Sequence, residues 1–204
     1  MTSIVYTIGH STHTLLKLVG LLKQNAIGAV ADVRSSPYSR MNPQFNREHL
    51  RDELRAEGIA YVFLGEELGA RTQDPTCYEN GKVQYDRLAR TELFRRGLER
   101  IKKGNESYRL ALLCAEKDPL FCHRMVLISR CLTEEGFDVK HILENGALES
   151  QEQTAERLLQ KFRMPGFDMF RPKADIVAEA FRRQAEAIAY QERPTVDATV
   201  RVRR

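Results

Sequence analysis

The sequence predicts an α/β protein with an open, doubly wound and mainly parallel sheet, of the Rossmann-like or flavodoxin-like kind. Short apolar runs rich in β-branched residues alternate with helical patterns over residues 1–146, and the runs lack the polar alternation of half-exposed strands. Strands buried on both faces have this continuous apolar character, and repeated strand-helix-strand units pair in parallel with right-handed crossovers. We expect about five strands, helices on both faces of the sheet, and extra C-terminal helices.

Five apolar runs are the predicted strands, and polar or reactive residues come at the end of each. The runs are residues 4–8, 29–33, 60–64, 109–114 and 139–143. In doubly wound domains, ligands bind at the carboxyl ends of the strands, near a switch in strand order. The candidate site is therefore the edge that joins the following strand ends: Gly9-His10-Ser11, Asp32 to Ser35, Leu64 to Glu66, Cys114 to Glu116, and His141.

Helices between these strands are indicated by apolar residues at helical spacing and by capping residues. The first is expected to begin at Ser11 or Thr12, and the second to follow Asn46 and to stop at Gly58. A third is expected over residues 85–103. A fourth is expected over residues 121–135, with Gly136 as its end.

The pattern changes after the last predicted strand. We predict an α/β domain over residues 1–146 and a helical extension with a polar tail over residues 147–204. Within the extension, helices are expected over residues 154–162 and 174–190. The second of these could pack back on the sheet or pair with a second subunit in a dimer, and the sequence leaves both open.

Composition argues against several classes of protein. The chain has 204 residues, a formal net charge of +4 and four cysteines. No apolar run approaches the roughly 18 residues of a membrane-spanning helix, and the first residues lack the pattern of a secretory signal. We expect a cytoplasmic protein with reduced thiols and no membrane partner. Much of the net charge comes from three tail residues, Arg201, Arg203 and Arg204.

The first candidate segment follows the predicted strand 29–33. Arginine side chains there offer planar donors that suit phosphate or carboxylate, and a serine adds a hydroxyl group. We predict a substrate-binding set at this edge that consists of Arg34, Ser35, Arg40, Asn42, Arg124 and Ser11. The alternative is a polar loop in which Asp32 and Arg34 pair with their neighbours.

The second candidate segment runs from Cys114 to Arg124. A thiol near a helix N-terminus and beside arginine or histidine can become a thiolate nucleophile, and a histidine or carboxylate at a strand end can move protons. The predicted catalytic set is Cys114, Glu116, Cys122, His123, His10 and Asp32. The alternative for Cys114 is a small apolar residue that completes a buried strand.

Metal binding is the less favoured interpretation of the cysteines. Cys114, Cys122, His123 and His10 could together supply four zinc ligands. The seven residues between the two cysteines, however, exceed the short spacing that is typical of zinc knuckles. We therefore predict no metal and no other cofactor, with zinc as the alternative.

Several separated motifs together resemble one known family. They are Thr7-Ile8-Gly9-His10-Ser11, Asp32-Val33-Arg34 with Ser36-Pro37 and Arg40, Asn42 to Asn46, Leu64-Gly65 with Leu68-Gly69, and Cys114-Ala115-Glu116 with Cys122-His123-Arg124. Over about residues 4–145 the chain is similar to the bacterial and archaeal domain of unknown function 488 family (DUF488). The resemblance implies an α/β domain and a shared site for these residues, without naming a reaction.

A looser similarity connects the chain to rhodanese-like sulfurtransferase domains. Asp32-Val33-Arg34 on one strand and a thiol at the end of a later strand are common to both. The loop differs, because nine residues separate Cys114 from Arg124 and Pro119 is among them. A tight ring of backbone N–H groups around a persulfide therefore does not follow from the similarity.

Three functions fit these residues. The leading hypothesis is an enzyme that acts on a phosphate-bearing substrate, a nucleotide or nucleic acid, at the carboxyl edge of the sheet. The alternative is a nucleic-acid-binding module without catalysis, which uses the same edge and the arginines of the tail. A further alternative is a rhodanese-like enzyme that transfers sulfur through a cysteine.

Overall fold

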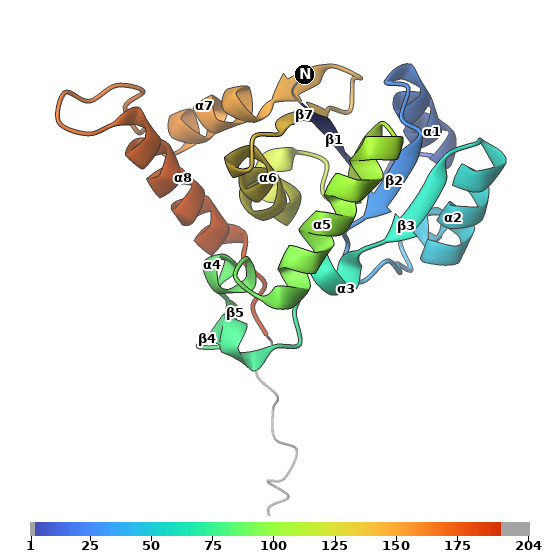
Figure 1. Cartoon of the computed structure of the whole chain (residues 1–204), viewed down its shortest axis with the longest axis horizontal. Helices are drawn as coiled ribbons and strands as arrows, with labels where there is room; N and C mark the ends of the chain where they lie inside the picture. Colours follow the sequence, from blue (N-terminus) through green and yellow to red (C-terminus); the bar gives the residue numbers. More distant parts are fainter. Residues whose placement is uncertain (1–2, 193–204) are drawn as a thin grey trace, which may run out of the picture.

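The centre of the protein is a six-stranded sheet with the strand order β3-β2-β6-β1-β7-β8. Figure 1 labels β3, β2, β1 and β7 of this sheet. The computed structural model describes residues 3–192. The strands of the sheet are β1 (Ile4–Gly9), β2 (Ala29–Asp32), β3 (Ala60–Phe63), β6 (Leu110–Cys114), β7 (Asp138–Ile142) and β8 (Leu148–Ser150). The first five are parallel to their neighbours, and only β8 is antiparallel to its partner. The predicted α/β fold is confirmed, and β8 is an edge strand that the sequence analysis did not predict.

Helices cover both faces of the sheet, as predicted. The helices α1 (Leu15–Gln24) and α2 (Arg47–Ala56) pack on one face, and α5 (Glu92–Ser107) packs on the other. Successive strand residues alternate between the two layers, so that Leu112 joins one buried cluster and Leu113 the other. Apolar side chains are needed on both sides of each strand for this reason.

The first predicted helix start was wrong by a few residues. Thr14 is the N-cap of α1, and its hydroxyl accepts a hydrogen bond from the backbone N–H of Lys17 at 3.2 Å. Ser11 lies in the left-handed region with a φ of 49°, and the residues around it form a turn before the helix. The predicted end of α2 is confirmed, because Gly58 has a φ of 74° directly after the helix.

The region that was predicted as one helix over residues 85–103 is broken. It consists of α4 (Tyr85–Leu88) and α5, and Thr91 caps α5 by accepting from the backbone N–H of Phe94 at 3.2 Å. Short elements that the sequence analysis missed are the 3-10 turns η1 (Pro43–Phe45) and η2 (Pro75–Cys77), the helix α3 (Gly65–Leu68), and the hairpin of β4 (Tyr78–Glu79) and β5 (Lys82–Val83). An Asn80-Gly81 turn with positive φ at both residues connects the hairpin strands, as two-residue hairpins prefer.

The fourth predicted helix contains a wide turn. A 3-10 turn, η3 (Pro119–Phe121), precedes the π-helical segment η4 (Arg124–Ser129), and α6 (Arg130–Glu134) follows it. Gly136 ends the element with a φ of 88°, as predicted. π-Helical turns are rare and concentrate at functional sites. This one begins directly after Cys122 and His123.

The C-terminal extension packs on the same core as the sheet. It contains α7 (Gln151–Lys161) and α8 (Lys173–Ile188), and Ile176 and Phe181 of α8 belong to one buried cluster with sheet residues. Beyond α8, the chain pairs with the hairpin through the Val83 N–H, which donates to the Tyr190 carbonyl at 3.0 Å. The last helix was predicted either to pack back on the sheet or to pair with a second subunit, and α8 packs against the core of its own chain. The tail arginines, Arg201, Arg203 and Arg204, lie outside the described residues.

Within the part of the chain that the structure describes, no helix combines the length and apolar character that crossing a membrane requires.

Candidate functional site

The site lies where the neighbouring strands β6 and β1 end. From β1 the chain leads to α1 on one face, and from β6 it leads to η4 on the other, so the two strands diverge in a switch of the kind that binds ligands. The β6 loop rests directly on Gly9, where an added Cβ would lie 1.8 Å from the Glu116 carbonyl oxygen. The His10 N–H donates to the Cys114 carbonyl at 2.9 Å. Glycine at position 9 therefore allows the loop to fold over β1.

Four reactive side chains converge at the start of this loop, and we call them the thiol cluster: Cys114, Glu116, Cys122 and His123. The carboxylate oxygen Oε2 of Glu116 lies 3.0 Å from Sγ of Cys114 and 2.9 Å from Sγ of Cys122. Nδ1 of His123 lies 3.6 Å and 3.9 Å from the same two sulfur atoms. One ligand atom from each of the four residues lies within 4.8 Å of the others. His10, which the zinc alternative included, is not part of this set.

The imidazole of His123 is held in one orientation. Its Nε2 atom lies 3.1 Å from the carbonyl oxygen of Val33, to which it donates as N–H. Nδ1 then faces both sulfur atoms. Burial opposes protonation of this ring, but the hydrogen bond with Cys122 and the charges of Cys122 and Glu116 raise the pKa of His123. When the ring is neutral, Nδ1 carries a lone pair. Cys114, Cys122 and His123 are buried, whereas Glu116 is the exposed member of the cluster.

The two thiols of the cluster differ in acidity. Burial, the hydrogen bond with Cys122 and the nearby negative charges raise the pKa of Cys114 well above its ordinary value. Burial opposes ionisation of Cys122 too, but a hydrogen bond from Cys114 and the charges of Arg124 and His123 outweigh it and lower the pKa of Cys122. Burial and the charge of Cys122 raise the pKa of Glu116. Of the two thiols, Cys122 is therefore the one whose thiolate form is favoured.

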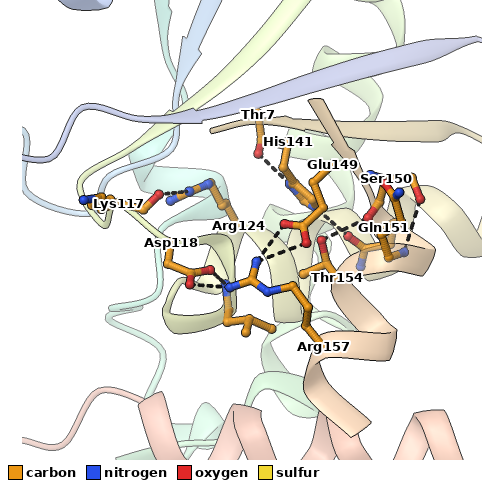
Figure 2. A network of polar contacts seen from close by, with 12 residues as sticks. Thr7, Lys117, Asp118, Arg124, His141, Glu149, Ser150, Gln151, Thr154 and Arg157 are labelled. Atoms are coloured by element: carbon orange, nitrogen blue, oxygen red, sulfur yellow. Dashed lines mark hydrogen bonds and ion pairs between the residues drawn. The ribbon is translucent and has the colours of Figure 1, made fainter. Parts of the chain in front are cut away.

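Arg124 is a fully buried cation next to the thiol cluster. Its Nη1 donates to the Glu116 carbonyl at 2.7 Å and its Nη2 to the Lys117 carbonyl at 3.2 Å, while Nε has no partner among the described residues. Figure 2 shows the guanidinium pointing at Lys117. Arg124 therefore fixes the β6 loop, and no carboxylate within residues 3–192 forms an ion pair with it.

The extension also holds this loop from the side. Arg157 of α7 lies between two carboxylates, 2.6 Å from Asp118 and 2.8 Å from Glu149 (Figure 2). From α8, the Gln184 amide donates to the Leu120 carbonyl at 2.5 Å. The loop that positions Glu116 thus depends on residues far along the chain.

A second group at the same edge, which we call the ion-pair cluster, consists of Asp32, Arg34, Tyr61 and His10. Nε and Nη2 of Arg34 donate to the two carboxylate oxygens of Asp32 at 2.9 Å and 2.6 Å, and Nη1 donates to Nε2 of His10 at 3.2 Å. The Tyr61 hydroxyl donates to Asp32 at 2.8 Å. Burial and the charge of Arg34 lower the pKa of His10 to about 4, so its imidazole is neutral.

A cavity of ≈ 220 Å³ opens beside the thiol cluster. Cys114, Glu116 and His123 line one part of it, and the exposed Arg71 lines another. The Arg71 guanidinium lies over the ring of Tyr190 at 4.6 Å, and its backbone N–H donates to Oγ of Ser35 at 3.0 Å. Other lining residues are Arg34, Ser36, Ala70, Tyr85, Ala115, Phe121 and Ile188.

A larger cavity of ≈ 520 Å³ lies between the β4-β5 hairpin and α8. Its lining contains charged residues, such as the ion-paired Asp86 and Arg130, but no cysteine or histidine. The groups with reactive chemistry are at the smaller cavity, which we therefore take as the candidate site.

The structure divides the residues of the predicted site into several groups. Four catalytic candidates form the thiol cluster, while His10, Asp32 and Arg34 form the ion-pair cluster. Ser35 lines the cavity; Ser11, Arg40 and Asn42 do not. The predicted roles of all these residues stay predictions. Arg71, Tyr85 and Tyr190 were missed, because Arg71 follows no strand and both tyrosines reach the cavity only through distant packing.

The fold and the site define a class: mainly parallel α/β proteins with a thiol-rich polar site at the carboxyl edge of the sheet. Within this class, the chain belongs to the family described as "Domain of unknown function DUF488", which matches residues 14–131, more than half of the chain. The match includes Asp32, Arg34 and the whole thiol cluster, but not Gly9 or the extension. No curated protein and no solved structure matches the chain.

Proposed function

We propose that the protein is an enzyme that acts on a small anionic substrate, of which a phosphate-bearing molecule is the leading candidate. The observation that carries the proposal is the composition of the ≈ 220 Å³ cavity, which joins the groups of the thiol cluster to the guanidinium of Arg71. Arg71 would bind the anion, and Glu116, the exposed member of the thiol cluster, would move protons at the reacting atoms.

Arg71 is the arginine of the site that is best suited to an anion. Its side chain is exposed, and no carboxylate within residues 3–192 forms an ion pair with it. By contrast, Arg34 donates to Asp32 and His10, and Arg124 donates to two backbone carbonyls. The hydroxyl groups of Ser35 and Ser36 line the same cavity and provide further donors.

The size of the cavity supports a small substrate. Pockets for drug-sized ligands measure roughly 300–1,000 Å³, and ≈ 220 Å³ is below that range. The volume suits an anionic group with a short attachment better than a whole nucleotide. A nucleic-acid substrate would have to place only one phosphate in the cavity.

The test is the binding of inorganic phosphate to the full chain, measured by titration calorimetry. Arg71→Ala is expected to weaken binding about tenfold or more, because a hydrogen bond to a charged group contributes about 1.5–3 kcal/mol. Arg40→Ala is the matched control, since Arg40 is exposed at the same edge but outside the cavity. Absence of phosphate binding, or a loss in Arg40→Ala alone, would contradict the proposal.

Activity is tested in parallel with small phosphate esters and anhydrides, by following the phosphate that is released. Glu116→Gln is expected to lose turnover while it keeps phosphate binding through Arg71. Retained turnover in Glu116→Gln would remove the proton-transfer role. The nucleic-acid module would instead be favoured by a different result. The protein would bind a random oligonucleotide more tightly than phosphate, the affinity would depend on salt, and Arg71→Ala would not change it.

Sulfur transfer is the second candidate, because Cys114 lines the cavity and the neighbouring Cys122, whose pKa is lowered, ionises more easily. In this reaction a cysteine thiolate takes the outer sulfur of thiosulfate, forms a persulfide and releases sulfite. The check is mass spectrometry of the protein after incubation with thiosulfate. A cysteine that gains one sulfur atom, with sulfite formed in equal amount, would support this candidate over phosphate chemistry.

A further inference from the structure

We infer that the thiol cluster binds one divalent transition-metal ion, with Zn²⁺ as the ion that its donor set fits best. Two thiolates, one imidazole and one carboxylate are typical zinc ligands, and the combination suits a tetrahedral site. The inference adds a cofactor to the site of the proposed function, and it rests on that function only for what the ion would do there.

The distances between the donor atoms fit one central ion. Bonds of about 2.3 Å to sulfur and about 2.0 Å to nitrogen or oxygen, at tetrahedral angles, separate sulfur from the lighter donors by about 3.5 Å. The distances from Nδ1 of His123 to the two sulfur atoms are 3.6 Å and 3.9 Å. The Glu116 carboxylate is closer, at 3.0 Å and 2.9 Å, and as the exposed member it can move outward.

Rigid elements hold the other three donors. Cys114 is at the end of β6, and Cys122 and His123 immediately precede η4. The bond from Nε2 of His123 to the Val33 carbonyl at 3.1 Å resembles the outer contact of metal-bound histidines, which fixes the ring and its tautomer. The same contact leaves Nδ1 as the donor toward the cluster. The seven-residue spacing is no obstacle, because the loop on Gly9 closes it in space.

The charge around the cluster also favours a bound cation. Arg124 is completely buried, its Nε has no partner among the described residues, and its other nitrogens donate to neutral carbonyls. A buried cation is costly unless negative charge lies beside it, and here the thiol cluster is the neighbouring source of negative charge. When two thiolates and one carboxylate bind a divalent ion, their three negative charges balance the ion and Arg124 together. The loaded site is thus electrically neutral, although it contains a buried arginine.

The exposed position of Glu116 suggests how the ion would work. Catalytic zinc sites combine three firm protein ligands with a fourth position that can exchange. Here the three buried ligands would hold the ion, and Glu116, the exposed ligand, would be the one that exchanges at the cavity, which Cys114 and His123 also line. The ion would act there as a Lewis acid toward the anion that Arg71 binds.

The test is a titration of the chelator-stripped full chain with Zn²⁺ against a chromogenic chelator. One ion per chain is expected, and Co²⁺ in its place should give thiolate-to-cobalt charge-transfer bands. Cys114→Ser and Cys122→Ser should each weaken binding by at least about a hundredfold, since loss of outer contacts alone costs about 10–100-fold. Cys131→Ser is the matched control, because Cys131 is partly buried in α6 outside the cluster.

The wild-type titration tests the inference even where a variant fails to fold. No stoichiometric ion, or binding without thiolate bands, would overturn it, and so would equal losses in Cys131→Ser and Cys122→Ser when circular dichroism shows both folded. Arg71→Ala separates the two proposals. This variant should bind Zn²⁺ as the wild type does and lose phosphate binding. If the wild type instead binds phosphate but no Zn²⁺, the proposed function stands and the metal inference is wrong.

Discussion

Two polar clusters lie side by side at the carboxyl edge of the sheet, and they differ in how completely their atoms are partnered. In the ion-pair cluster, all three guanidinium nitrogens of Arg34 donate within the cluster, and both oxygens of Asp32 accept. In the thiol cluster, both thiols share one oxygen of Glu116, and the lone pair of His123 has only sulfur neighbours. The guanidinium and carboxylate atoms of the first cluster are hydrogen-bonded within it, whereas in the second cluster one donor atom from each residue lies within 4.8 Å of the others.

The difference shows that residue type alone does not identify a functional group. Arg34 and Glu116 both looked like site residues, because both follow a strand of a doubly wound sheet. Polar groups that are buried and fully bonded stabilise one arrangement of the chain. Polar groups that converge without adequate partners are the better candidates for binding a ligand. We therefore propose a structural role for the ion-pair cluster and a chemical role for the thiol cluster.

The largest expected effect comes from breaking the ion-pair cluster. Asp32→Asn should destabilise the protein by about 3–5 kcal/mol, because it leaves Arg34 buried without its counter-charge. Urea unfolding measures the change. Glu57→Gln is the control, since the ion pair of Glu57 with Lys23 is exposed and should contribute less than about 1 kcal/mol. A stable Asp32→Asn protein that has lost only its activity would return Asp32 to the catalytic set.

Removal of metal should have the next largest effect. With free Zn²⁺ at about 100 times its dissociation constant, the wild type should gain about 2.7 kcal/mol of stability over the stripped protein. Cys122→Ser should gain far less, while Asp32→Asn, if it folds, should gain the same amount as the wild type. Urea unfolding with and without Zn²⁺ gives these differences. An equal gain in Cys122→Ser would show that the ion binds elsewhere and would erase the contrast between the two clusters.

A buried histidine extends the comparison to a third polar group, because it is as fully partnered as the ion-pair cluster. His141 of β7 accepts from the Thr7 hydroxyl at 2.8 Å and lies 2.7 Å from the Gln151 amide oxygen (Figure 2). Burial, together with the charge of Arg124, lowers its pKa to about 4, although Cys122 and Asp118 oppose this. The neutral ring is therefore part of the folded structure.

The pH dependence of stability follows from this shift. The unfolded chain binds a proton on His141 below about pH 6.5, whereas the folded protein does so only below about pH 4. Stability from this group is complete above pH 6.5, falls as the pH decreases, and is lost below pH 4. Between pH 7 and 5 the loss is about 2 kcal/mol. In urea unfolding, His141→Gln should lack this loss of stability between pH 7 and 5, whereas the exposed His49→Gln should retain it. An equal pH dependence in the wild type and both variants would refute the role of His141.

Much of the fold was predictable from sequence, because buried parallel strands leave a local apolar signal. Two features were missed although the sequence contains a signal for each. Thr91 is a recognisable N-cap that marks the split of the third helix, and Asn80-Gly81 is a typical hairpin turn. The proposed metal ligands were harder to predict, because spacing rules describe short loops. Here packing on Gly9 and bonds from Arg157 and Gln184 close a longer loop. Arg71 left no local signal, because Tyr190 positions it from the far end of the chain.

The smallest expected effect on stability comes from replacing Arg71, a residue that we expect to affect ligand binding rather than stability. Arg71 is exposed, and its side chain packs on the ring of Tyr190 at 4.6 Å, a contact that contributes about 0.5–1 kcal/mol. Arg71→Ala should therefore change the free energy of unfolding by at most about 1 kcal/mol, while phosphate affinity falls about tenfold or more. Asp32→Asn should do the reverse. Urea unfolding and phosphate titration of both proteins check this. A large loss of stability in Arg71→Ala would mean that the arginine holds the segment after α8 in place. Its effect on binding would then no longer separate a functional group from a structural one.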